Sequence, residues 1–206
     1  MATDLRLSAR GLGDLPGVMD FEAVVPDIQS IAATKPSEVA RFVWDTMSAE
    51  SQKGGARGKI FVICLAVVLL REGITPFYVN CGVRGVPSHK WDFILAREDG
   101  SAVVISAHVA IRERWAHEDL AAWALKREIN SSSEAYVVIE NEIEAAQLRR
   151  RIDSGQVEFL DGSAQVFSED FDKLVHGLRG EAFVDSPSII DRGSAAKQLG
   201  FGPIDA

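Results

Sequence analysis

Residues 91–115, WDFILAREDGSAVVISAHVAIRERW, contain the pattern that decides the fold. The mostly apolar segment 90–96 predicts a strand, and the Asp-Gly pair within 97–101 is typical of a tight hairpin turn. A second apolar segment, 102–109, predicts the returning strand. Residues 111–115 then lead into a helix. The stretch therefore predicts an antiparallel hairpin followed directly by a helix.

Three polar side chains lie on this predicted hairpin. Ser106 and His108 are two positions apart on the second strand, so they point to the same face. Asp92 lies on the first strand, and we expect it to face them across the hairpin. Trp91 and Phe93 alternate with Asp92 and are expected to share the other face. The hairpin is thus predicted to bring a carboxylate, a hydroxyl and an imidazole together.

The rest of the chain predicts further helices and strands around the hairpin. The spacing of apolar residues and the turn residues between them predict helices at 27–33, 36–50, 59–72, 116–129, 141–155 and 168–178, and further strands at 74–83, 135–140 and 157–161. Segment 84–89, RGVPSH, is expected to be a turn. In 116–129, Leu120, Trp123, Ala124 and Arg127 lie at helical spacing. A strand, a crossover helix and another strand indicate an α/β fold, with a mixed central sheet flanked by helices.

Composition and charge limit the classes of protein that fit. The formal net charge is −8, and the balance is −4 over residues 1–50, +3 over 51–130 and −7 over 131–206. This leaves two interpretations: an acidic protein with ordinary scatter, or a compact basic face inside an acidic average. Cys64 and Cys81 show no C-x-x-C spacing, which favours buried thiols in a reducing cytoplasm. No signal peptide is visible, so we expect a cytoplasmic protein.

One apolar helix bears on membranes and on assembly. The longest apolar run, 60–70, has 11 residues, fewer than the roughly 18–20 needed to span a bilayer, so no membrane association is expected. It is apolar all round and must be covered on more than one side, by the sheet and by either the N-terminal helices or a second subunit. We therefore expect a homodimer or a heteromer with a related subunit. The predicted organisation is an N-terminal arm with helices at 1–53, a core at 54–180 and a C-terminal tail at 181–206.

The hairpin pattern resembles that of a known nuclease superfamily. A strand Asp, here Asp92, followed after a turn by S-x-H at 106–108 is similar to the D…E-x-K signature of the PD-(D/E)xK superfamily, which has the restriction-endonuclease-like fold. VAIRERW at 109–115 resembles the K-T-S-L-R-E-R-W segment that follows the catalytic lysine in one group of type II restriction endonucleases. GARGKIF at 55–61 is similar to the G-x-x-G-K-I-F of that group. The resemblance covers roughly residues 54–178.

This resemblance implies a metal-dependent DNA endonuclease with double-stranded DNA as its partner and Mg²⁺ or Mn²⁺ as its cofactor. Asp92 would ligate the metal, His108 would ligate it or activate water, and Ser106 would orient the water. Arg112 and Arg114 would contact phosphates of the DNA. The alternative for these two arginines is a set of salt bridges that locks the helix entry to the sheet.

The sequence departs from the family pattern at the positions that carry the chemistry. Ser106 stands in place of the second acid and His108 in place of the lysine. Some relatives carry the second acid on the helix after a G-K-x-F stretch, and that position here is Val62. Asp92 is therefore expected to be the single carboxylate of a degenerate site. Three hypotheses remain: a weakly active or inactive DNA-associated nuclease, a non-catalytic DNA-binding or partner subunit, and a metal-binding regulatory protein unrelated to nucleic acid.

Two further histidines lie close to the hairpin in sequence. His89 is expected to be a solvated residue at the end of a turn, and His117 a surface residue near the start of a helix. The alternative is a four-membered metal site that combines both of them with Asp92 and His108.

Overall fold

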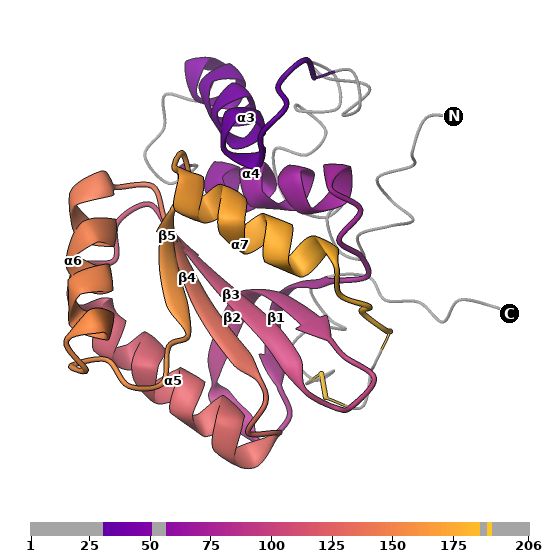
Figure 1. Cartoon of the computed structure of the whole chain (residues 1–206), viewed down its shortest axis with the longest axis vertical. Helices are drawn as coiled ribbons and strands as arrows, with labels where there is room; N and C mark the ends of the chain where they lie inside the picture. Colours follow the sequence, from indigo (N-terminus) through magenta and orange to yellow (C-terminus); the bar gives the residue numbers. More distant parts are fainter. Residues whose placement is uncertain (1–30, 51–56, 186–188, 191–206) are drawn as a thin grey trace, which may run out of the picture.

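The computed structural model describes residues 31–50, 57–185 and 189–190 (Figure 1). Most of the helix predicted at 27–33 lies outside this part. The elements are α3 (Pro36–Glu50), α4 (Arg57–Arg71), β1 (Tyr78–Val83), β2 (Val86–Ala96), β3 (Ala102–His108), the 3-10 turn η3 (Arg112–Arg114), α5 (Trp115–Glu128), β4 (Glu134–Ile139), α6 (Glu142–Asp153), β5 (Gly162–Gln165) and α7 (Glu169–Arg179). Within the described residues, no helix has the length and apolar character needed to cross a membrane.

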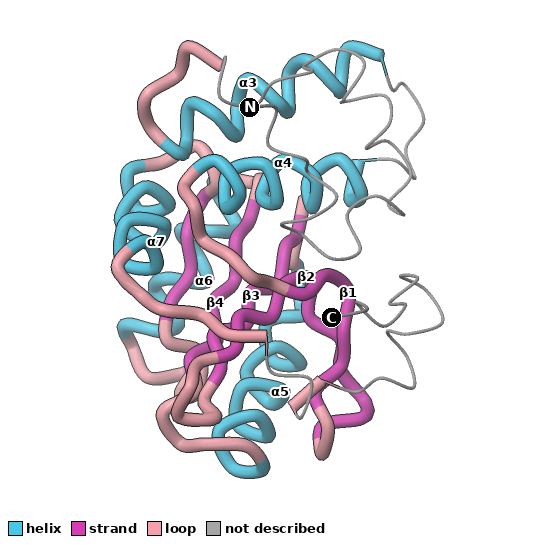
Figure 2. The backbone as a smooth tube through the Cα atoms, turned by 90° about the vertical axis from the view of Figure 1, so that its right-hand side faces the viewer, coloured by secondary structure: helices cyan, strands magenta, loops and turns pink. Residues whose placement is uncertain are grey.

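The strands form one mixed sheet in the order β1-β2-β3-β4-β5. The pairs β1–β2 and β2–β3 are antiparallel, whereas β3–β4 and β4–β5 are parallel. Helices α5 and α6 pack on one face, and α4 and α7 pack on the other (Figures 1 and 2). The predicted α/β fold with a mixed central sheet is confirmed.

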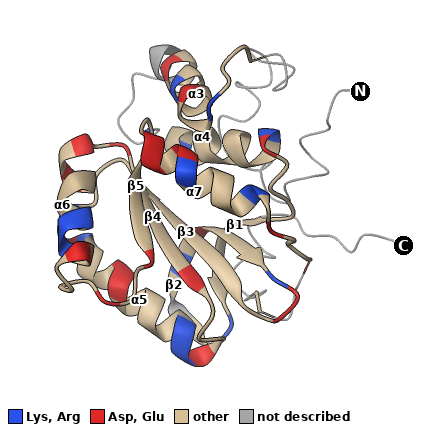
Figure 3. Ribbon diagram, viewed as in Figure 1, with Lys and Arg blue, Asp and Glu red and all other residues tan. Residues whose placement is uncertain are grey.

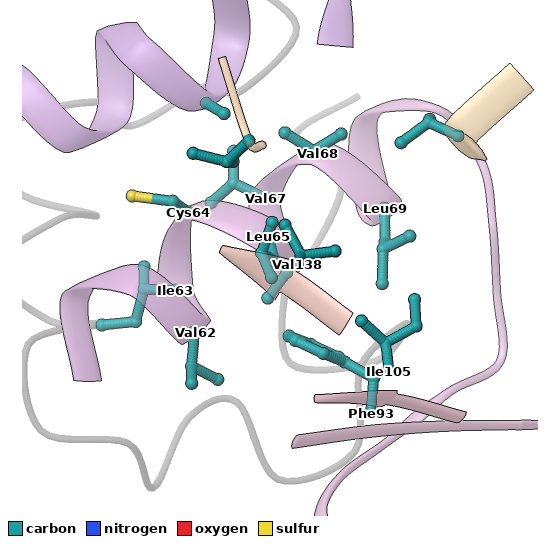
Figure 4. Close-up of a cluster of buried hydrophobic side chains, with 14 of the residues drawn as sticks. Val62, Ile63, Cys64, Leu65, Val67, Val68, Leu69, Phe93, Ile105 and Val138 are labelled. Atoms are coloured by element: carbon teal, nitrogen blue, oxygen red, sulfur yellow. The ribbon is translucent and has the colours of Figure 1, made fainter. Parts of the chain in front are cut away.

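Helix α4 fills the core on one face of the sheet. Every residue of its apolar run is buried. Leu65 and Leu69 lie beside Phe93, Ile105 and Val138 of the sheet (Figure 4). The opposite side of α4 is covered by α3, which lies farther from the sheet (Figure 2). A single chain therefore covers this helix, and its apolar character no longer requires a second subunit.

Two predicted segments have different structures. Segment 84–89 is not a turn throughout, because β2 already begins at Val86 and the turn is reduced to two residues, with Gly85 in the left-handed region at φ 93°. Segment 157–161 is not a strand. Its backbone N–H groups at Phe159 and Leu160 donate to the carboxylate of Asp119, so they cannot join the sheet, and the fifth strand is Gly162–Gln165 instead.

Candidate metal and catalytic site

The site begins where strands β2 and β3 diverge. The two strands are paired from Ala96↔Ala102 to Phe93↔Ile105. Asp92 is the first residue of β2 beyond the last of these pairs. The side chain of Asp92 turns toward β3, and its Oδ2 accepts a hydrogen bond from the backbone N–H of Ala107 at 2.7 Å. Asp92 therefore lies between Ser106 and His108 along the chain of β3, which places the three predicted residues in one region.

The strands change faces at Asp92. The residue opposite Asp92 in β1 is Asn80, which lies between the pairs Val79↔Phe93 and Cys81↔Trp91. Asn80 has a left-handed backbone conformation, with φ 54°. Trp91 packs in the core under α5, whereas Phe93 packs in the core under α4. The predicted alternation of Trp91 and Phe93 on one face is therefore wrong. The left-handed residue in β1 twists both strands and turns the start of β2 toward α5.

Helix α5 supplies a carboxylate that the sequence patterns did not indicate. Glu118 is only 5% exposed. Its Oε2 accepts a hydrogen bond from Ser106 Oγ at 2.7 Å, and its Oε1 lies 3.0 Å from His108 Nε2. Asp92 remains the only carboxylate of the hairpin motif, and Glu118 adds a second one beside Ser106 and His108 from outside the motif.

The buried face of α5 differs from the predicted one. Leu120 is 60% exposed, and the residues of α5 that pack inward are Glu118, Ala121, Ala122 and Leu125. These four positions have the spacing of a single helix face. An acid at the start of an otherwise apolar stripe is the sequence signal by which Glu118 could have been found. The small alanine side chains let the helix lie close to the sheet.

His89 is a second buried residue of the site region, contrary to the solvated position predicted for it. It was expected in a solvated turn, but it lies in β2 and is 7% exposed. Its Nε2 is 3.4 Å from Glu118 Oε2, and its ring contacts the rings of Trp91 and His117. His117 is exposed, as expected.

These contacts decide which groups can share a metal ion. Within the described residues, His89, His117 and Glu118 each offer a ligand atom, and the three atoms lie within 4.8 Å of one another. The four-membered alternative named Asp92 and His108 as the partners of the two histidines. The structure gathers His89 and His117 around Glu118 instead.

The two carboxylates have different electrostatic environments. Burial raises the pKa of Asp92 to about 6, and the charge of Glu118 acts in the same direction. The Ala107 N–H and the nearby histidines act against this rise. Burial would also raise the pKa of Glu118, but interactions with His108, His89 and Ser106 hold it well below its usual value. Glu118 is therefore ionised at neutral pH, and Asp92 loses its proton just below it.

The arginine-bearing turn lies between β3 and α5. Glu144 of α6 fixes this turn by accepting the backbone N–H groups of Ile111 and Arg112 on its Oε2, at 2.5 and 2.8 Å. The side chains of Arg112 and Arg114 are exposed, and neither forms an ion pair within the described part of the chain. The turn is thus locked through its backbone, which leaves both guanidinium groups available to an anion.

Other residues considered as ligands have structural roles. Val62 stands where some members of the resembled superfamily carry the second acid. It is a residue of α4, is 6% exposed and packs in the hydrophobic core on that side of the sheet. Cys64 and Cys81 are free and buried, and burial raises the pKa of both thiols. Neither cysteine belongs to the group of possible metal ligands found among the described residues.

Comparison with known proteins supports the architecture. No family model matches the sequence, and no curated protein matches it. Among solved structures, the chain is similar to restriction endonuclease PspGI, solved in complex with substrate DNA, with a TM-score of 0.50 and 14% sequence identity over 80% of this chain and 74% of that one. The chain thus has a restriction-endonuclease-like fold, as the hairpin pattern predicted. The match of VAIRERW to the restriction-endonuclease segment remains a prediction.

Proposed function

We propose that this chain is a divalent-metal-dependent nuclease of double-stranded DNA that uses Asp92 and Glu118 as its metal-ligating carboxylates. The observation that carries the proposal is the buried carboxylate of Glu118, which reaches Ser106 and His108 from helix α5. It supplies the second negative charge that the hairpin lacks. The fold shared with a restriction endonuclease, whose solved structure contains substrate DNA, supports DNA as the substrate.

Asp92, Glu118 and His108 carry donor groups of the types that bind a divalent ion, but the ligand atoms that lie close together among the described residues are those of Glu118, His89 and His117. Carboxylate oxygens suit Mg²⁺ and Mn²⁺, and the imidazole of His108 shifts the preference toward Mn²⁺. Both acids can serve at neutral pH, since the pKa of Asp92 is raised only to about 6 and that of Glu118 is lowered. When bound, the ion would polarise the scissile phosphate and lower the pKa of a water molecule.

His108 is suited to the role of general base. An ionised carboxylate can only accept hydrogen bonds, so the proton of a neutral His108 lies on Nε2, which faces Glu118 Oε1 at 3.0 Å. The lone pair is then on Nδ1, which can either ligate the ion or accept a proton from water. Ser106 donates its hydroxyl to Glu118 and acts as a positioning residue for that carboxylate.

Arg112 and Arg114 complete the proposed DNA contact. Their guanidinium groups follow β3 directly, are exposed and suit bidentate binding of phosphate. Along the ribbon in Figure 3, basic residues are interspersed with acidic ones in α5, α6 and α7. Binding is therefore expected to depend on a few local phosphate contacts and to weaken as salt concentration rises.

The test is a cleavage assay on varied duplex DNA at low salt, with Mn²⁺ and Mg²⁺ compared. The wild type should cleave, faster with Mn²⁺, and both Asp92→Asn and Glu118→Gln should lose cleavage. Glu113→Gln is the matched control, because Glu113 is an exposed acid near the site. Cleavage that survives in both carboxylate variants would overturn the assignment of the two metal ligands.

A second candidate is a non-catalytic DNA-binding module or partner subunit. It is favoured by the closed hydrogen-bond network, in which Ser106 and His108 contact the carboxylate of Glu118 and the Ala107 N–H donates to Asp92. In that case duplex binding would be salt-dependent, would be weakened in Arg112→Ala and would persist in Glu118→Gln, and no metal would produce cleavage. Absence of both binding and cleavage would exclude both candidates.

A further inference from the structure

The Nε2 atom of His89 is buried without a hydrogen bond of ordinary length. His89 is 7% exposed, and among the described residues this nitrogen has only an ion-pair contact with Glu118 Oε2, at 3.4 Å. A buried imidazole nitrogen left in this state is costly, and such exceptions are often found where a ligand binds. The ring of Trp91 packs edge-on against His89, with ring centroids 4.6 Å apart, and fixes the direction of the imidazole.

The separation between His89 and Glu118 matches that of two ligands of one ion. His89 Nε2 lies 3.4 Å from Glu118 Oε2. Two atoms that each bind a tetrahedral Zn²⁺ at about 2.0–2.1 Å are separated by about 3.3–3.4 Å. The same distance is long for an N–H···O hydrogen bond, whose usual range is about 2.7–3.2 Å.

His117 brings a third donor close to this pair. Its ring centroid is 5.1 Å from that of His89, and ligand atoms of His89, His117 and Glu118 lie within 4.8 Å of one another. His117 is exposed, so the cluster is open to solvent on the α5 side. Three protein ligands and an open side are typical of zinc sites that keep one coordination position for water or substrate.

We propose that His89, His117 and Glu118 form a binding site for a zinc-class divalent ion, with a fourth position left for water or a phosphate oxygen. Two imidazole nitrogens and one carboxylate oxygen suit Zn²⁺ or Co²⁺ rather than Mg²⁺. Ser106 and His108 bond to the same carboxylate and hold its orientation, as outer partners of metal ligands do.

This site goes beyond the proposed nuclease function. It requires neither DNA nor cleavage, and it uses two histidines that the proposed Asp92–Glu118 pair does not use. Because Glu118 belongs to both ligand sets, the test depends on residues that belong to only one of them. His117 belongs to the zinc-class site alone, whereas His108 belongs to the site predicted from the hairpin.

The experiment measures metal binding by the metal-free full chain. Co²⁺ is titrated first, because tetrahedral Co²⁺ absorbs visible light far more strongly than octahedral Co²⁺, and Zn²⁺ is then followed by calorimetry. The wild type should bind one equivalent with a tetrahedral-type spectrum that Zn²⁺ abolishes. His117→Ala removes an exposed side chain, so the fold should be kept, and it should weaken Zn²⁺ binding by more than about tenfold.

Other histidine variants supply the control and the results that would contradict the proposal. His176 on α7 is also exposed, and His176→Ala should bind Zn²⁺ as the wild type does. Equal Zn²⁺ affinity in His117→Ala and the wild type would overturn the proposal. So would lost binding in His108→Ala together with unchanged binding in His117→Ala, because the ion would then lie with the hairpin residues. DNA cleavage is not a readout here, so failure of this site would be distinct from failure of the nuclease function.

Discussion

Replacing Glu118 by glutamine tests whether the buried carboxylate stabilises the fold. The ionised side chain is bonded to Ser106 Oγ at 2.7 Å and to His108 Nε2 at 3.0 Å. A hydrogen bond to a charged group contributes about 1.5–3 kcal/mol, and a neutral one about 0.5–1.5 kcal/mol. Only one end of the amide group can accept. For Glu118→Gln we expect the free energy of unfolding to fall by about 2–3 kcal/mol.

Electrostatic repulsion between Glu118 and Asp92 opposes this loss of stability. The charge of Glu118 helps to raise the pKa of Asp92, so its removal relieves a repulsion. However, burial is the largest cause of the raised pKa of Asp92, and the surroundings as a whole hold the pKa of Glu118 below its usual value. The environment therefore favours the charged form of Glu118, and the loss should exceed the relief.

The assay is urea unfolding followed by tryptophan fluorescence, in the presence of a chelator so that bound metal does not contribute. In thermal unfolding of a chain of this size, the same change in free energy corresponds to a decrease in melting temperature of roughly 4–12 °C. Glu113→Gln, at an exposed position, should change stability by less than about 0.5 kcal/mol. A Glu118→Gln protein as stable as the wild type, or more stable, would refute the reasoning. It would indicate that the buried charge of Glu118 destabilises the folded chain.

The remaining predictions concern the core and the DNA contact. Leu65→Ala should lower the free energy of unfolding by about 2–5 kcal/mol in urea denaturation, because Leu65 is 3% exposed, whereas Leu120→Ala, at a 60% exposed position, should change it little. Val62→Glu should destabilise the chain in the same assay without raising its Mn²⁺ affinity in calorimetry, since it would put an unpaired charge into the core. Arg112→Ala and Arg114→Ala should each weaken duplex binding for all sequences and reduce the slope of log affinity against log salt by about 1, measured by fluorescence anisotropy.

The order of the elements was predictable because its signals are local. The Asp-Gly turn between two apolar segments predicted the hairpin, and Ala102–His108 is a strand as expected. Gly73 ends α4 with φ 71°, and Gly155 follows α6 with φ 71°, as the breaks in the helical patterns indicated. These features depend on neighbours within a few residues of each other, which the sequence shows directly.

The grouping of the polar residues on the hairpin was predictable, and the residues that reach them from α5 and the start of β2 were not. Asp92, Ser106 and His108 could be grouped because they lie on one hairpin. Glu118 could not be added from the sequence, because the rotation of α5 about its axis is set by how its alanines pack on the sheet. His89 was missed because β2 extends further than its pattern indicated and turns toward α5.

The sequence by itself determined a mixed α/β fold and a polar hairpin, because strand and helix periods and turn chemistry are properties of short segments. The tertiary structure alone decided which side chains meet at that hairpin. The left-handed Asn80 beside Asp92 changes the face of both strands, and the packing of α5 brings Glu118 to Ser106, His108 and His89. The polar hairpin therefore gains a buried carboxylate as a neighbour from helix α5, through contacts that arise only when the chain is folded.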